Sequence, residues 1–391
     1  MNEATCKHVP ALGLSFCTES ASSANADPAL QRRWEALVAQ SQSPEAVFQT
    51  PGYFDFISAV PNLKNTQRLV VLRDTRSQDI VGVVPLRAGR RTWPLALGGL
   101  TLARLRLNTI ALLGSVPLAP HEPAVLEQLF DYIFATFPAT GSIAMQAVPE
   151  DSRFFHAVSA SRHLRERYGI YIKDGWRACH TTPLPSSFDA YLRQFKAKKR
   201  YNIQRQLNLL AKDVGPLRLT QVDRLDQIPL LLKTMRELVT PHFASAMMSE
   251  AQYRALMERR IALCYVLHSG ERPCAVVIGI RSRSTYHVHN IIYDQTLASY
   301  SPGTSLLHLA TQQLIDTEHM SLIDYGYGDP GHSQQSSNTT NMRSQVFVYR
   351  RTWTNRMRLA AYSSFGAMVD WGKRVSTSLT KVLMVTALPF Y

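Results

Sequence analysis

The sequence predicts a mixed α/β protein built of two tandem units, each a mixed and mostly antiparallel sheet flanked by helices. Three observations lead to this prediction. The chain has 391 residues, more than one ordinary domain contains. Residues 68–87 and 261–281 each consist of two β-rich runs around a polar turn, the pattern of a β-hairpin. A further strand, a helix and another strand follow each hairpin in the same order, which indicates a duplicated unit.

The first unit is predicted at residues 28–180. Its expected elements are helices around Trp34 and at 53–60, the first hairpin, strands at 93–97 and 107–113, a helix at 123–137 and a strand at 142–148. Residues 1–27 are rich in Ala, Ser and Asn and show no apolar periodicity, so we expect a flexible leader there.

The second unit is predicted at residues 181–354. Its expected elements are helices at 191–210, 230–239 and 251–261, the second hairpin, a strand at 286–293, a helix at 304–318 and a strand at 321–325. An apolar stripe at helical spacing predicts the first of these helices. Residues 355–391 are basic and weakly amphipathic, which predicts a helical tail.

Composition narrows the class of protein. Hydrophobic residues make up 45% of the chain and charged residues 18%, an ordinary balance for a globular protein. The formal charge of +14 favours an anionic partner, which leaves cofactor phosphates, nucleic acid and a membrane surface open. The five cysteines form no CxxC pair, so we expect neither a disulfide framework nor a structural zinc site. We therefore expect a cytoplasmic protein, soluble or peripheral on the inner membrane face.

The most informative segment joins the strand that ends at Tyr293 to the helix that begins at Ser301-Pro302-Gly303. Ser301 is a good N-cap residue, and proline suits the first helical position because it has no amide proton. The amides of Gly303, Thr304 and Ser305 lack helical acceptors, and no carboxylate competes for them in this turn. With the helix dipole they favour a pyrophosphate. The alternative is an ordinary helix start, since Ser-Pro-Gly begins many helices.

The order of these elements, with "YDQTLASYSPGTSLL" and the following "DYGYGD", resembles the GNAT superfamily of acyltransferases. The nearest group is the acetyltransferases related to cellulose-biosynthesis proteins, the CelD/BcsL type with a BioF2-like domain, and hence polysaccharide biosynthesis. "FDAYLRQFKAKKRYNIQRQLNLL" at 188–210 resembles the basic helix that opens this domain in the group, and the likeness extends weakly to "FQTPGYFDF". It implies two GNAT-like units and acetyl-CoA or another acyl-CoA as donor. From the residues themselves we expect no metal. By this resemblance Gly303 and Thr304 match the loop that holds the coenzyme A pyrophosphate.

Two departures from the group's pattern matter. The Pro-rich segment 116–123 stands where the first unit would have its phosphate loop, so we expect that unit to lack a cofactor and to form one wall of the cleft. After Gly328-Asp329 the group shows a Tyr-Lys pair, whereas this chain has a polar loop at 330–340. That loop is either a rebuilt acceptor pocket or a sign of lost activity.

The candidate catalytic residues are His289, Tyr293, Asp324, Tyr325 and Asp329. Strict alternation along 286–293 would place His289 and Tyr293 on one face, where they could serve as base and acid. Asp324 could orient the base or bind the ammonium of the acceptor. The structural alternatives are a buried core histidine, a packed tyrosine and a loop-capping aspartate. His287-x-His289 could be half of a metal site, but no third ligand at a recognisable spacing supports it.

These features predict an acyl-CoA-dependent N-acyltransferase in which the amine of a small molecule, amino sugar or biosynthetic intermediate attacks the thioester directly. One alternative is an aminoacyl-tRNA-dependent, Fem-like transferase, since a basic chain can hold tRNA through its phosphates. Another is a non-catalytic module on a membrane surface, motivated by the basic stretch 350–358 and the apolar C-terminus. The basic helix at 196–205 would contact phosphate in the first two cases, and is otherwise a solvated face.

Overall fold

The computed structural model describes residues 6–41, 43–60, 66–97, 100–238, 247–282, 284–327 and 339–386. Its strands form one 13-stranded sheet in the order β1-β2-β3-β4-β5-β6-β13-β7-β12-β11-β10-β9-β8. The strands are β1 (Cys6–Val9), β2 (Leu14–Ser20), β3 (Gln67–Asp74), β4 (Ile80–Leu97), β5 (Leu100–Leu112), β6 (Ser142–Pro149), β7 (Tyr168–Pro183), β8 (Leu217–Val222), β9 (Ala262–Ser269), β10 (Arg272–Ser282), β11 (Thr285–Tyr293), β12 (Leu322–Asp324) and β13 (Thr339–Arg350).

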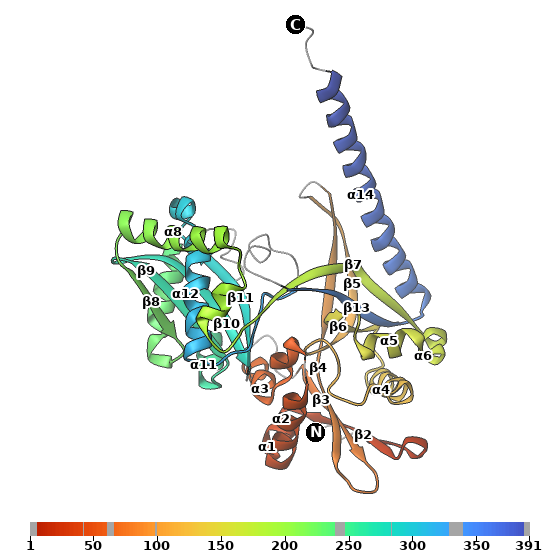
Figure 1. The fold of residues 1–391 in the computed structure, drawn as a ribbon. Coiled ribbons are helices and arrows are strands. Elements are labelled where there is room, and N and C mark those ends of the chain that lie inside the picture. Colours follow the sequence, from red (N-terminus) through yellow and green to blue (C-terminus); the bar gives the residue numbers. More distant parts are fainter. Residues whose placement is uncertain are drawn as a thin grey trace.

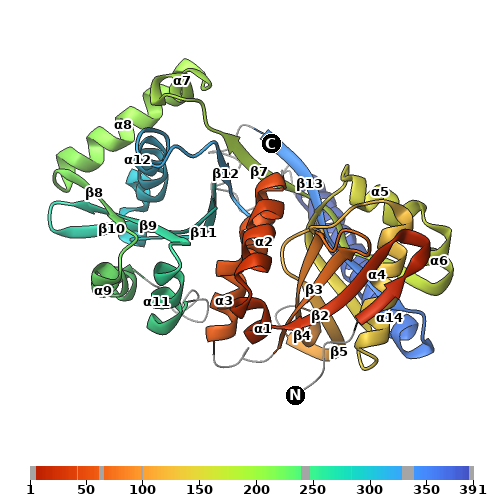
Figure 2. The same cartoon turned by 90° about the horizontal axis from the view of Figure 1, so that it is seen from below.

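Helices cover the sheet in two groups, one for each unit (Figures 1 and 2). The first unit contributes α1 (Ala21–Ala26), α2 (Pro28–Gln40), η2 (Pro44–Gln49), α3 (Pro51–Ala59), α4 (Pro123–Thr136), α5 (Arg153–Ala160) and α6 (Arg162–Arg167). The second contributes α7 (Phe188–Arg193), α8 (Ala197–Asp213), α9 (Ile228–Leu238), α11 (Glu250–Glu258) and α12 (Pro302–Asp316).

The duplicated architecture predicted from the hairpins is present. In each unit a first strand, a set of helices, an antiparallel hairpin, a third strand, a helix and a further strand follow one another: β2 to β6 in the first unit and β8 to β12 in the second. The last two strands of each set are parallel, and they pair over three residues only: β5 with β6 from Thr109↔Ser142, and β11 with β12 from Thr285↔Leu322. These two short parallel contacts position the site described below.

The units exchange strands, which the sequence did not reveal. β13, from the end of the second unit, lies between β6 and β7 of the first. β7 in turn pairs through Thr181–Pro183 with β12 of the second unit. The predicted boundary between residues 180 and 181 therefore lies inside one strand.

One apolar core also crosses between the units. It joins Trp34 and Phe54 of the first unit to Met235 and Tyr253 of the second, and none of these side chains exposes measurable surface. Separate cores lie under α4 and under α12. Burial of shared apolar surface on this scale fixes the two units against each other.

The expected flexible leader is wrong for the described residues 6–27, because β1, β2 and α1 are ordered and pack against β3 and α3. Leu14 and Phe16 are buried, so two apolar residues among Ser, Cys and Thr anchor β2. A disulfide joins Cys6 to Cys17, which face each other in the β1–β2 register. The expected absence of a disulfide framework did not anticipate this single pair. The spacing carried no signal, because antiparallel register alone brings the two thiols together.

The predicted C-terminal tail is helical as α14 (Trp353–Thr386), which extends away from the body (Figure 1). Its first turns pack Leu359 and Tyr362 against Trp93 of β4. Within the part of the chain that the structure describes, no helix combines the length and apolar composition needed to cross a bilayer.

Candidate active site

A β-bulge in β11 shapes the site. Ile278 of β10 pairs with Asn290, whereas the next residue, Gly279, pairs with Val288, so His289 is an extra residue without a partner in this register. The bulge reverses the alternation beyond it. Tyr286, Val288, Ile291 and Tyr293 all pack in the core under α12.

The predicted alternation is therefore wrong beyond Val288, and His289 and Tyr293 do not share a face. His287 and Ile292 face the first unit, where the His287 ring contacts Phe48 with centroids 5.0 Å apart. His289 and Asn290 line a cavity between the units. Tyr293 packs beneath Gly303, where an added Cβ would lie 3.4 Å from the tyrosine ring.

The start of α12 is open to a ligand at two amides. Ser301 is the N-cap residue as predicted, but it is left-handed (φ 52°) and its side chain makes no capping bond; instead its hydroxyl accepts a hydrogen bond from Gln206 at 3.1 Å. The Ser305 amide donates to the Ser301 carbonyl at 3.1 Å and is used within the helix. Among the described residues, the amides of Gly303 and Thr304 have no acceptor. No acidic residue lies in this turn.

A groove of about 370 Å³ adjoins this turn and runs between α8 and α12. Thr304, Leu307 and His308 line it from α12, and Lys199, Asn202 and Gln206 from α8. The Lys199 ammonium lies 3.9 Å above the centre of the Phe195 ring, and burial lowers its pKa. The basic helix predicted at 196–205 thus contributes one cationic side chain to the groove that Thr304 also lines.

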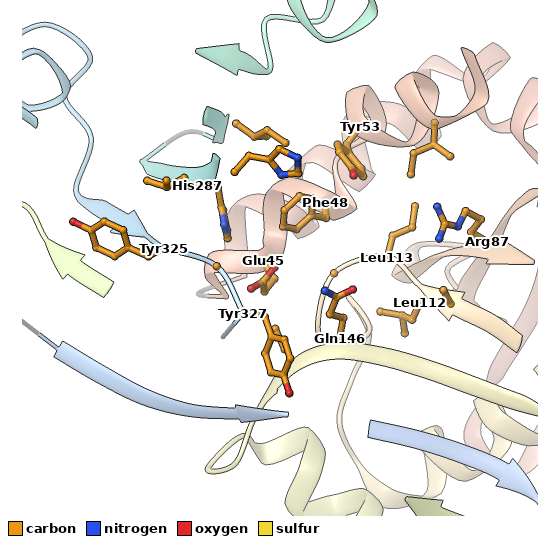
Figure 3. A pocket seen from close by; sticks show the side chains of 18 of the residues that line it. Glu45, Phe48, Tyr53, Arg87, Leu112, Leu113, Gln146, His287, Tyr325 and Tyr327 are labelled. Atoms are coloured by element: carbon orange, nitrogen blue, oxygen red, sulfur yellow. The ribbon is translucent and has the colours of Figure 1, made fainter. Parts of the chain in front are cut away.

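A larger cavity of about 700 Å³ lies between the units. Both parallel strand pairs open onto it where their pairing ends. Leu112 and Gln146 line it from the first unit, and Tyr327 from the second (Figure 3). His289 of the second unit lines it as well. Tyr325, directly after β12, lines both the cavity and the groove. The groove and the cavity are therefore neighbours across the gap between β11 and β12.

Tyr325 is buried, and burial raises the pKa of its phenol well above the ordinary value. Its hydroxyl accepts a hydrogen bond from Thr182 at 3.5 Å. The phenol therefore keeps its proton at neutral pH, so it can act as an acid but not as a base.

A buried ion network closes the floor of the cavity. The Arg343 guanidinium of β13 donates to Asp324 at 2.7 Å and to Glu45 of η2 at 3.2 Å, and all three side chains are at least 90% buried. His287 forms a 2.7 Å hydrogen bond with the Pro44 carbonyl. The network links the two units, since Glu45 and Asp324 belong to different units.

Burial raises the pKa of Glu45 above the ordinary value for a carboxyl, and the nearby Asp324 charge adds to this, while His287 and Arg343 act in the opposite direction. Ligand atoms of Glu45, His287 and Asp324 lie within 4.8 Å of one another, a separation that would suit a metal ion. Arg343 already supplies a positive charge to both carboxylates, so we interpret the cluster as an ion network and assign no metal to it.

The remaining predicted residues have these positions. His289 is exposed within the cavity, and desolvation by the cavity walls, together with the charge of His287, lowers its pKa. Asp324 is fully buried and accepts from Arg343 and from the Gly326 amide at 2.7 Å, so it holds the loop after β12. Asp329 and loop residues 330–338 lie outside the described residues.

Sequence reasoning missed four residues that line or support the cavity: Glu45, Arg87, Arg91 and Arg343. The only signal for Glu45 is a single acidic residue in the otherwise apolar stretch "PEAVF". The two β4 arginines interrupt an apolar strand pattern at positions that share one face.

Comparison with known family models finds a match for most of the second unit. Residues 197–333 match the family model of the acetyltransferase (GNAT) domain. No curated protein matches the chain.

Solved structures show the fold over most of the chain. FemX has 12% sequence identity and a TM-score of 0.57, over 82% of this chain and 96% of FemX. A conserved protein of unknown function from Bacteroides thetaiotaomicron has 13% identity and a TM-score of 0.52, over 82% and 97% of the two chains. The C-terminal domain of a putative lysylphosphatidylglycerol synthetase from Agrobacterium fabrum has 11% identity and a TM-score of 0.50, over 85% and 94%.

These solved structures share the fold of this chain, and the family-model match of residues 197–333 indicates the type of reaction. The chain is therefore a transferase enzyme built of two mixed α/β units, and residues 197–333 of its second unit are the part that matches the GNAT acetyltransferase model.

Proposed function

We propose that the protein is an acyl-CoA-dependent N-acyltransferase that binds its donor in the groove beside α12 and its amine acceptor in the cavity between the units. One observation carries this proposal. The open amides of Gly303 and Thr304 lie at a groove that meets the cavity at Tyr325, where β11 and β12 diverge. A donor held by its diphosphate at the helix start can thus present its thioester to an amine on the other side of the sheet.

Donor binding rests on backbone and side-chain charge. Two free amides and the positive end of the α12 dipole suit a diphosphate. Lys199 adds a positive charge in the same groove. The acyl-CoA is the substrate that supplies the activated acyl group; the residues named here bind and orient it.

The reaction needs a base, a polarised carbonyl and an acid. The amine nitrogen attacks the thioester carbon, forming the amide C–N bond while the C–S bond breaks. We assign the base to His289, whose lowered pKa keeps it neutral and able to accept the ammonium proton. The bulge leaves His289 without a partner in the β10–β11 register, so its backbone amide is the candidate that polarises the carbonyl. Tyr325 is the candidate that returns a proton to the leaving thiolate.

The donor site is tested by adding a negative charge to it. We expect Thr304→Glu to weaken acetyl-CoA binding in isothermal titration by at least about tenfold, because a carboxylate beside the free amides competes with the diphosphate. Thr304→Gln, similar in size and neutral, is the matched control and should bind within about threefold of wild type. Equal binding by both variants would remove the α12 site from the proposal.

An aminoacyl-tRNA donor is the second candidate. The charge of +14 and the exposed basic residues of α8, including Lys198 and Arg205, favour it. Titration with tRNA at moderate salt separates the two: saturable tRNA binding without acetyl-CoA binding would favour the second candidate. Assignment to the CelD/BcsL group, and with it a role in polysaccharide biosynthesis, is likewise a proposal that rests on the sequence motifs.

A further inference from the structure

Two arginines of β4 line the cavity and have no anionic partner among the described residues. Arg87 and Arg91 are four residues apart, so both point to one face of the strand, and both are half-buried (Figure 3 labels Arg87). Among the residues that the structure describes, neither guanidinium forms an ion pair or a hydrogen bond. The sequence from Ile80 to His121 contains no Asp or Glu that could serve as one.

Such an arrangement is costly without a ligand. Two guanidiniums on one face repel each other, and burial together with Arg87 lowers the pKa of Arg91. Glu45 also lines the cavity, but its carboxylate already accepts a hydrogen bond from Arg343. Arginine pairs bind carboxylate and phosphate through several parallel N–H···O bonds, so an anion entering this end of the cavity would satisfy both side chains.

The rest of the cavity lining has different chemistry. It includes His289, the loop after β12 and Glu45, whose carboxylate lies within 4.8 Å of that of Asp324 at the end of β12. A molecule that fills the cavity therefore meets cations on the wall of the first unit and a neutral histidine and a carboxylate near the strand gap. This polarity suits a substrate with an anionic group at one end and an amine at the other.

We propose that Arg87 and Arg91 form an anion-binding subsite, and that the acceptor is an amine that also carries a carboxylate or a phosphate. The claim that the acceptor is an amine rests on the proposed function. The claim that Arg87 and Arg91 bind an anion does not. It gives the first unit a specific role: it selects the acceptor, while the second unit holds the donor.

Matched acceptor pairs test the substrate class. Thiol release from acetyl-CoA is measured with β-alanine against 3-aminopropanol, and with phosphoethanolamine against ethanolamine, so that carboxylate and phosphate are judged separately. We expect at least one anionic member to have the higher kcat/KM by about tenfold or more. Arg87→Ala and Arg91→Ala should raise its KM at least about tenfold with little change in kcat, because remote binding is lost. The neutral member should be unaffected.

Arg104→Ala is the control, since Arg104 lies on the adjacent strand β5, is exposed and does not line the cavity. Arg87→Lys keeps the positive charge, and Arg91→Gln removes the charge but keeps a long polar side chain. These two variants test the role of charge if an alanine variant folds poorly. Equal use of the anionic and neutral members, or an equal effect of Arg104→Ala, would overturn the inference.

A binding measurement separates this inference from the proposed function. Glutarate and inorganic phosphate are titrated into the protein and into Thr304→Glu, which disables the α12 site. Saturable binding that survives in Thr304→Glu and is lost in Arg87→Ala supports the subsite, even if no amine is acylated. Thiol release without any anion preference would support the transferase and remove the subsite. No binding of either anion, with no preference in turnover, also overturns it.

Discussion

Removing Arg343 should destabilise the protein far more than an ordinary surface change. In Arg343→Met, two buried carboxylates, Glu45 and Asp324, lose the guanidinium that lies 3.2 and 2.7 Å from them. Breaking a buried pair from one side costs about 3–5 kcal/mol, because the charges that remain are uncompensated. This is a large part of the ~5–15 kcal/mol that stabilises a typical native protein.

Urea unfolding at pH 7.5 measures the loss, and its pH dependence tests the cause. Burial already raises the pKa of Glu45, and without Arg343 the pKa of this carboxyl in the folded state lies further above its unfolded value. The folded variant then binds more protons than the unfolded chain, so its stability falls as pH rises and recovers as pH is lowered. We expect the deficit relative to wild type to shrink between pH 7.5 and pH 5.

The triple variant Glu45→Gln, Arg343→Met, Asp324→Asn provides the control. It removes all three charges with side chains of similar size, so it should regain much of the stability lost in Arg343→Met. A loss below about 1 kcal/mol in the single variant, or a triple variant as unstable as the single one, would refute the reasoning.

Three further outcomes are expected. His289→Asn should lower kcat by about 100-fold or more. Wild-type activity should fall as the pH drops through the pKa of His289, which is lowered below the ordinary 6.5. If the variant keeps the same loss of activity at acid pH, this histidine is not the base. Cys6→Ser with Cys17→Ser should lower the free energy of unfolding by about 2–3 kcal/mol in urea, since the disulfide closes an 11-residue separation; identical curves for wild type with and without reductant would contradict this. Arg91→Leu should keep or raise the Tm in differential scanning fluorimetry, because it removes a half-buried charge that has no partner in the described part of the chain. A clear drop in Tm would point to an anionic contact within the protein.

The local elements were predictable, because the sequence pattern carries them. Both hairpins, α12 and its proline at the first helical position occur where periodicity and turn residues indicated. The duplicated order of strands and helices followed from the same signals. Short strands with few apolar residues, such as β2 with Phe16, gave too weak a pattern.

The site was less predictable, because long-range pairing builds it. Glu45 and Arg343 are 298 residues apart in sequence and meet only because β13 crosses into the first unit. The bulge at His289 depends on the register between two strands, and a one-residue shift moves every later side chain to the other face. Neither feature leaves a trace in the pattern of a single strand.

A crystal structure of the protein soaked with acetyl-CoA tests the donor site at the level of atoms. We expect diphosphate oxygens about 3 Å from the amides of Gly303 and Thr304, and the thioester in the gap between β11 and β12 beside His289. A donor whose diphosphate lies away from the start of α12, with that turn still open, would contradict the proposed function.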